Sequence, residues 1–396
     1  MLAEDQNYII NTYQRSPIEI AYGKGSYLTD IQGNCYLDMF SGIAVNALGH
    51  QHPKINEVLV NQAKNYLHLS NVFTSPPVIG LAKRLVKNSF ASKVFFANSG
   101  TEANEAALKL ARKWGKTISE NKTEILALHQ AFHGRSSGGM ALTGKAEYKT
   151  QFAPILPGIT HIPRNDNRAL KQAMHHNVCA IFLEMIQGEG GVQVLDQTYV
   201  DELVVLSKEY NVLIVVDEIQ TGLMRTGKLF AYEHFGFEPD MVTLAKALGG
   251  GLPIGALLVN KSLENVFSYG DHGSTFGGNP LACALGEVVM DEILDGPFVK
   301  SMNDNMIFLF ESLIAIKNTY PSSIIEVRGL GFMIGIEVGN LAPIYKERML
   351  TKNILINVTN KTVIRLLPAL NINRDEISHF IQTFKEVTEA IIKEEV

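Results

Sequence analysis

Cysteine is scarce in this chain and forms no recognisable pattern. Cys35, Cys179 and Cys283 are the only three among 396 residues, and no C-x-x-C pair occurs. Disulfide-stabilised secreted domains and zinc ribbons need paired, closely spaced cysteines, so the sequence indicates neither. The scarcity fits a reducing compartment, and we expect a cytoplasmic protein.

The chain also lacks an excess of positive charge and any long apolar run. Lys and Arg number 35 against 40 Asp and Glu, a net charge of -5, which leaves no basic stripe to neutralise nucleic-acid phosphates. No apolar run approaches the roughly 18 residues of a membrane span, and the N-terminus has no basic region followed by an apolar one. We therefore expect no nucleic-acid partner, no membrane span and no targeting segment.

Apolar surface, by contrast, is abundant. Hydrophobic residues make up 46% of the chain and charged residues 19%, a balance typical of compact globular proteins and not of disordered chains. The length of 396 residues exceeds the usual size of one hydrophobic core. Two domains, or one large domain with a satellite, are expected.

The residue pattern changes along the chain and predicts three parts. Residues 1–52 have the pattern of short strands and turns, which we assign to an N-terminal arm and part of a small domain. Residues 53–285 alternate helical stretches with short apolar runs at 93–97, 124–128, 180–183, 212–216, 241–245 and 255–259. Such runs suit strands covered on both faces, so this part is predicted to be a large α/β domain with a mainly parallel sheet. Residues 286–396, with apolar runs at 324–327, 332–338, 354–358 and 363–367 before an amphipathic terminal helix, are predicted to form a smaller α+β domain.

Ligands of an open parallel sheet bind beyond the carboxyl ends of its strands, so the residues that follow the apolar runs are site candidates. Ser99, Gly100 and Thr101 follow the run 93–97, and Glu102 stands at capping-box spacing from Ser99. The pattern predicts a helix that begins near Gly100 and whose free N–H groups can hold a phosphate. An ordinary strand-to-helix turn would have the same pattern.

Three further strand ends carry ionisable residues. Asp217 follows the run 212–216, where a buried carboxylate needs a cationic partner, although on this position alone a helix cap or a solvated loop acid explains it equally well. Lys246 follows 241–245 and precedes three glycines, where an amine can be desolvated into a nucleophile, although most single lysines are solvated. Glu184 follows 180–183, and the glycine-rich segment behind it carries Glu189, whose role the spacing leaves open.

A phosphate-binding helix start, a carboxylate and a lysine at one sheet edge match the needs of pyridoxal phosphate. Lys246 would attach the cofactor as an imine, Asp217 would pair with the protonated pyridine nitrogen, and the turn 99–101 would bind the phosphate. Keeping that nitrogen protonated stabilises the carbanion that forms when a proton leaves the substrate carbon. No H-E-x-x-H motif occurs, and the one G-x-S-x-G match, at 134–138, does not directly follow an apolar run as a nucleophile elbow would, so neither a catalytic metal nor a serine nucleophile is expected.

At these residues the chain resembles the class III (ω-amino acid) aminotransferases, which are fold type I pyridoxal-phosphate enzymes. The resemblance runs nearly end to end and is carried by the segments 41–50, 95–112, 132–135, 187–191, 217–220, 246–251, 272–279 and 364–368. Each motif is weak evidence alone, but so many in order exclude chance similarity. The resemblance implies a seven-stranded, mainly parallel sheet between helices in the large domain, and a homodimer whose active sites are shared between subunits.

The resemblance also implies which residues contact the cofactor. Phe132 would stack on its ring, Gln220 would hydrogen-bond its phenolic oxygen, and Thr275 would reach the phosphate bound by the neighbouring subunit. The other cofactor-site positions that it implies are His133, Glu184 and Ser274.

On the substrate side, the resemblance implies that Arg135 binds the carboxylate remote from the reacting carbon. Arg365 would pair with Glu189 in the resting site and be released for the α-carboxylate of glutamate or 2-oxoglutarate. Related ornithine aminotransferases have a tyrosine at the position of Ile43, and loss of its hydroxyl favours an acylated α-amino group. The implied reaction transfers the terminal amino group of N-acetylornithine to 2-oxoglutarate, giving N-acetylglutamate semialdehyde and glutamate, as in arginine biosynthesis.

Other readings stay open. Succinylornithine, N-succinyl-diaminopimelate, ornithine or 4-aminobutyrate could be the amino donor. Aminomutases, racemases and decarboxylases of this fold would also need Lys246 and Asp217, but the pair of Glu189 and Arg365 favours amino transfer. A non-catalytic nucleotide-binding α/β protein is disfavoured because no G-x-G-x-x-G opens a helix.

The chain departs from the usual family pattern at two positions. Met185 stands where a proline commonly follows the glutamate, and Met224 stands where a glycine commonly precedes the arginine. Neither departure removes a reacting group.

Overall fold

A seven-stranded sheet is the largest sheet of the protein. The computed structural model describes residues 2–395. The strands of this sheet are, in spatial order, β4 (Lys93–Ala97), β12 (Gly255–Val259), β11 (Met241–Leu244), β10 (Leu213–Asp217), β7 (Val178–Leu183), β5 (Glu124–Leu128) and β6 (Ile159–Ile162). Neighbouring strands are parallel except at β12, which is antiparallel to both β4 and β11. The predicted α/β fold with a mainly parallel sheet is confirmed.

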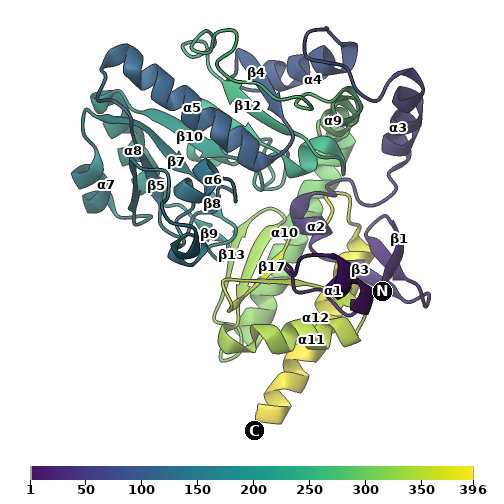
Figure 1. Cartoon of the computed structure of the whole chain (residues 1–396). Helices are drawn as coiled ribbons and strands as arrows, with labels where there is room; N and C mark the ends of the chain where they lie inside the picture. The colour runs from purple at the N-terminus through teal and green to yellow at the C-terminus, as the bar shows by residue number, and fades with distance from the viewer. Residues whose placement is uncertain (1, 396) are drawn as a thin grey trace.

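Both faces of this sheet are buried, which explains why its strands are apolar at every position. Ile214 and Val216 of β10 belong to one apolar cluster, whereas Leu213 and Val215 belong to the other. Helix α5 (Gly100–Ile118) covers the second face, and α8 (Gln197–Tyr210) contacts β10 from the first (Figure 1). Alternate side chains of each strand therefore pack against different helices.

Two smaller sheets lie below the large one in the view of Figure 1. One is antiparallel and contains β13 (Glu326–Leu330), β14 (Met333–Glu337), β17 (Val363–Leu366) and β16 (Asn357–Thr359). The other contains β1 (Ile20–Lys24), β2 (Tyr27–Asp30), β3 (Cys35–Asp38) and β15 (Ile354–Leu355). Because β15 pairs with β3, the two ends of the chain share one sheet. The division at residues 52 and 285 stays a prediction.

The remaining elements connect and cover these sheets. They are α1 (Leu2–Tyr8), α2 (Ser41–Ala44), α3 (Pro53–Asn65), α4 (Pro76–Lys87), α6 (Ser137–Leu142), α7 (Asn167–Ala173), α9 (Pro280–Ile293), α10 (Gly296–Thr319), α11 (Ala342–Thr351), α12 (Arg374–Glu395), β8 (Ile186–Gln187), β9 (Gln193–Val194) and the 3-10 helices η1 (Ala146–Tyr148), η2 (Thr150–Phe152), η3 (Ala231–Phe235), η4 (Lys246–Gly249) and η5 (Gly339–Leu341). Within residues 2–395, none of the helices is long and apolar enough to cross a membrane.

The predicted runs at 93–97, 124–128 and 255–259 coincide with β4, β5 and β12, and those at 180–183, 212–216 and 241–245 overlap β7, β10 and β11. The run 354–358 was wrong as a single strand, since β15 and β16 belong to different sheets. β6 was missed because it is a half-exposed edge strand with no continuous apolar run.

We expect Gly115→Ala in α5 to destabilise the fold, because an added Cβ would lie 1.9 Å from the main-chain oxygen of Lys122. Relieving this overlap should cost roughly 2 kcal/mol of unfolding free energy, measured by urea unfolding. Gly296→Ala is the control, since no atom lies within 4 Å of its added Cβ and it should change stability by less than about 0.5 kcal/mol. Equal midpoints for the two variants would contradict this account of the packing.

Candidate active site

A cavity of about 450 Å³ opens at the carboxyl ends of β4, β5, β7, β10 and β11, beside the N-terminus of α5. It is where the fold brings together most of the predicted site residues. Those lining it are Ser99, Gly100, Thr101, Phe132, His133, Arg135, Glu184, Glu189, Asp217, Gln220 and Lys246. The convergence follows from the parallel arrangement, which turns all five strand ends toward one edge.

Lys246 opens η4, two residues beyond the end of β11, with a φ of 46°. This left-handed conformation is sparsely populated by residues other than glycine and stores strain of about 1–2 kcal/mol. Burial and the positive charge of Arg365 lower the pKa of Lys246 to about 8, although nearby carboxylates oppose the shift. Its amine is therefore more readily converted to the unprotonated, nucleophilic form than that of an ordinary lysine.

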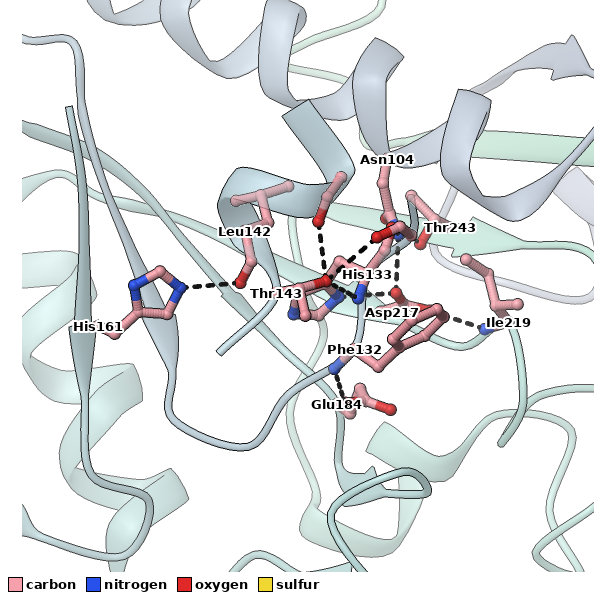
Figure 2. A network of polar contacts seen from close by, with 12 residues as sticks. Asn104, Phe132, His133, Leu142, Thr143, His161, Glu184, Asp217, Ile219 and Thr243 are labelled. Atoms are coloured by element: carbon pink, nitrogen blue, oxygen red, sulfur yellow. Dashed lines mark hydrogen bonds and ion pairs between the residues drawn. The ribbon is translucent and has the colours of Figure 1, made fainter. Parts of the chain in front are cut away.

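Asp217, the last residue of β10, is held by three donors (Figure 2). Its Oδ2 accepts from Asn104 Nδ2 at 2.8 Å and lies 2.8 Å from His133 Nδ1, while its Oδ1 accepts from the Ile219 amide at 3.0 Å. The sequence predicted that this carboxylate needs a cationic partner, and His133 lies in the position to be one. Burial alone lowers the pKa of His133, but the hydrogen bond and charge of Asp217 outweigh burial and raise it.

The network continues behind Asp217 to the next strand. Thr243 of β11 donates to Asn104 Oδ1 at 2.8 Å, which orients the Asn104 amide so that its NH₂ group faces Asp217. The same NH₂ group donates to the main-chain oxygen of His133 at 2.9 Å. Strand β10, helix α5 and the loop after β5 are thereby held together at the base of the cavity (Figure 2).

Glu184 is a second buried acid near Asp217. Its Oε2 accepts from the Phe132 amide at 3.0 Å, which fixes the loop that carries the Phe132 ring. Burial raises the pKa of Glu184 to about 7, an effect that the charge of His133 opposes. Glu184 can therefore exchange a proton near neutral pH inside the cavity.

The N-terminus of α5 has the predicted cap with one difference. Ser99 Oγ accepts from the Glu102 amide at 3.3 Å, but Glu102 Oε2 accepts from the Asn98 amide instead of that of Ser99. The loop after β5 lies directly on this turn, because a Cβ on Gly134 would be 2.1 Å from Thr101 Oγ1. First-turn N–H groups have no partner within their helix, so they are available to an anion in the cavity.

Arg135 lies at the cavity mouth with its side chain exposed. Its guanidinium carbon is 4.0 Å from the centre of the Tyr148 ring and 5.6 Å from that of Phe132. Two aromatic faces within about 6 Å stabilise a cation without neutralising it. Arg135 is thus oriented toward an incoming carboxylate while its charge stays available.

Glu189 and Arg365 form a direct ion pair, with Oε1 and the guanidinium NH1 2.7 Å apart. The same NH1 donates to Gln220 Oε1 at 3.2 Å, and Asn357 Oδ1 accepts from the Arg365 Nε and NH2 at 3.1 and 2.8 Å. Arg365 is only 2% exposed. Burial alone raises the pKa of Glu189, but the charge of Arg365 outweighs burial and lowers it.

Four predicted site residues are not part of the cavity lining, and one of them, Arg365, is joined to the lining by its contacts with Glu189 and Gln220. Ser274 Oγ accepts from Asn98 Nδ2 at 3.0 Å, and Thr275 is exposed on the surface. Ile43 lies in α2, where four successive residues have positive φ, and packs against a small apolar cluster. The roles of Thr275 toward a second subunit and of Ile43 toward the substrate stay predictions.

Sequence reasoning missed Asn104, Tyr148 and Asn357. Asn104 is fully buried on the apolar face of α5, and a single polar residue in such a stripe could have indicated it. Tyr148, in the irregular η1, and Asn357, in β16, have no comparable signal because only the fold brings them to the site.

These residues fit pyridoxal phosphate. The cavity combines an amine of lowered pKa, a carboxylate held in place by three donors, an aromatic ring and a helix start. Lys246 would hold the aldehyde carbon, Asp217 the ring nitrogen, Phe132 one ring face and the 99–101 turn the phosphate. No cluster of three or more potential metal ligands occurs in residues 2–395.

The chain is similar to known aminotransferases over nearly its whole length. A family model described as Aminotransferase class-III matches residues 8–388. The chain is 44% identical over 394 residues to the acetylornithine aminotransferase of Methanocaldococcus jannaschii, and the matched region covers 98% of each chain. It is 41% identical to that of Aquifex aeolicus, covering 96% of this chain and 99% of the relative.

Solved structures agree with this assignment. The N-acetylornithine aminotransferase from Stenotrophomonas maltophilia K279a is 33% identical with a TM-score of 0.86, covering 99% of this chain and 100% of that one. The ornithine aminotransferase from Toxoplasma gondii ME49 is 32% identical with a TM-score of 0.94, covering 99% and 95%. The match over nearly the whole length, together with the lysine and aspartate at one sheet edge, means that the chain belongs to the class III aminotransferase family.

Proposed function

We propose that the protein is a pyridoxal-phosphate-dependent aminotransferase that moves the terminal amino group of N-acetylornithine to 2-oxoglutarate. The observation that carries the proposal is that Lys246, Asp217 and Glu189 line one cavity and that Glu189 is ion-paired with Arg365. The relatives that are 41% to 44% identical and bear the name acetylornithine aminotransferase support the choice of donor.

The reaction moves a proton at the substrate carbon. Bound pyridoxal phosphate supplies an electron-withdrawing ring that stabilises negative charge on that carbon. Asp217 would keep a proton on the ring nitrogen, since its carboxylate is held in place at the base of the cavity. The Lys246 amine, with a pKa near 8, accepts the proton from the substrate carbon as a general base.

Two arginines accommodate two different substrates. N-acetylornithine has one carboxylate, which Arg135 binds at the cavity mouth while Glu189 keeps Arg365 neutralised. Glutamate and 2-oxoglutarate have two carboxylates, so Glu189 must release Arg365 to bind the second. One pocket thereby accepts both partners of the transfer.

Two identical subunits would complete the site. Val72 and Phe73 are exposed, and so is Phe276, which follows Thr275 in the chain. Asn71 Nδ2 donates to the main-chain oxygens of Ser274 and Gly277, which holds these two segments together. Exposed apolar patches of this kind mark protein interfaces, which supports a homodimer in which Thr275 faces the partner's cofactor phosphate.

A panel of amino donors assayed with 2-oxoglutarate tests this function. We expect the kcat/KM for N-acetylornithine to exceed those for ornithine and 4-aminobutyrate at least tenfold, about 1.4 kcal/mol of transition-state stabilisation. Lys246→Ala should remain folded but lose turnover and the visible absorption of covalently held cofactor. Preference for ornithine would reject the acyl specificity, and covalent attachment at a different lysine would reject the role of Lys246.

Asp217→Asn should slow proton abstraction about 100-fold, or roughly 3 kcal/mol, because it removes the charge that keeps the ring nitrogen protonated. Single-turnover kinetics measures this step. Glu218→Gln is the matched control, since this neighbouring acid is buried outside the cavity against Thr221 and the Tyr232 amide. Burial raises the pKa of Glu218 to about 7, so the neutral amide resembles its protonated form. Similar slowing in both variants would mean that lost stability, and not the Asp217 charge, is responsible.

Glu189→Ala should favour glutamate over N-acetylornithine as donor. The variant removes the need to break an ion pair only in the glutamate half-reaction, which should shift the ratio of the two rates by about 1–3 kcal/mol. Rapid mixing of each donor with the holoenzyme measures both rates. The exposed acid of Glu147 serves as a control, and Glu147→Ala should leave the ratio unchanged. An equal fall of both rates in Glu189→Ala would mean that Glu189 has only a structural role in its loop and does not switch between substrates.

A further inference from the structure

Lys145 is a nearly buried cation whose ammonium is bound to a main-chain oxygen. Its side chain lies in the loop after α6 and is 8% exposed. The ammonium donates to the main-chain oxygen of Glu189 at 2.7 Å, and within residues 2–395 no acidic side chain lies at ion-pair distance from it. Lysine is seldom buried without a charged partner, because removing its charge from water is costly. The ammonium therefore has capacity for a carboxylate.

A second cavity, of about 560 Å³, lies beside this ammonium. Lys145, Tyr148, Thr359 and Lys361 contribute to its lining. Glu189 lines both this cavity and the site cavity, so it stands between the two. A carboxylate that leaves Arg365 thus has space on the other side.

The main chain of Glu189 is held in place from this second cavity. Its carbonyl oxygen accepts from Lys145 Nζ at 2.7 Å and from Thr359 Oγ1 at 3.2 Å. With its backbone fixed, Glu189 can change partner only by rotating its side chain. An ammonium bound to the carbonyl of a residue lies within reach of that residue's own side chain, and the charge of Lys145 is already among those that hold the pKa of Glu189 down.

We propose that Lys145 is a positioning residue that receives the Glu189 carboxylate when Arg365 binds the second carboxylate of glutamate or 2-oxoglutarate. The inference rests on the proposed function, because it assigns the second position of the same switch. While N-acetylornithine is bound, Lys145 holds the main chain of Glu189 but receives no carboxylate, since Glu189 then stays on Arg365. Its contribution is therefore specific to the dicarboxylate substrates.

Lys145→Gln in the holoenzyme tests the proposal, because an amide can still donate to the Glu189 carbonyl but has no charge. At low donor concentration, we expect the rate constant for the reaction of the holoenzyme with glutamate to fall about tenfold, which is the scale for losing a charged partner. The rate constant for its reaction with N-acetylornithine should change less than about twofold. Lys145→Arg should restore the wild-type ratio. Lys361→Gln is the matched control, since it removes an exposed ammonium from the same cavity and should leave the ratio unchanged.

A double-mutant cycle separates this role from a structural one. In the Glu189→Ala background there is no carboxylate to receive, so Lys145→Gln should no longer alter the ratio of the two rates. An unchanged effect in that background, or an equal fall of both rates in the single variant, would overturn the proposal. A wild-type enzyme that reacts with N-acetylornithine but not with glutamate would instead overturn the proposed function itself.

Discussion

The site depends on one buried negative charge, the carboxylate of Asp217. A carboxylate at the end of a fully buried strand is tolerated only when its oxygens are satisfied, and its donors come from α5, from the loop after β5 and from its own turn. These contacts are therefore also the contacts that fix the helix start and the loop bearing Phe132. The geometry of the cavity follows from the need to satisfy this charge.

Its chemistry follows from charges that cannot all be neutralised at once. Lys246, Arg365 and His133 lie near Asp217, Glu184 and Glu189, and burial disfavours the charged forms of Lys246, His133, Glu184 and Glu189. The opposite charges of neighbouring groups counteract the effect of burial on the pKa values of Lys246 and Glu184 but do not cancel it. The pKa of Lys246 falls to about 8 and that of Glu184 rises to about 7, so proton transfer within the cavity costs little near neutral pH.

The sequence alone could locate the site residues at the strand ends but not the side chains that contact them. Asp217 and Lys246 were predictable because each follows an apolar run, and a buried parallel sheet turns such ends to one edge. The pairing of Glu189 with Arg365 spans 176 residues and came only from the family resemblance, never from spacing. Tyr148 and Lys145 lie in and beside a short 3-10 turn, where no periodicity shows which way a side chain points.

The departure at Met224 shows how a strained residue is retained near this site. Met224 has a φ of 68°, in the left-handed region where the glycine common at this position would be unstrained. The strain of about 1–2 kcal/mol is offset by burial of the methionine side chain, worth roughly 1.5–3 kcal/mol, in the main apolar cluster. The next residue, Arg225, donates to the main-chain oxygen of Pro368 at 2.5 Å, three residues beyond Arg365. The larger side chain therefore keeps a loop geometry that helps to hold the strand of the substrate-binding arginine in place.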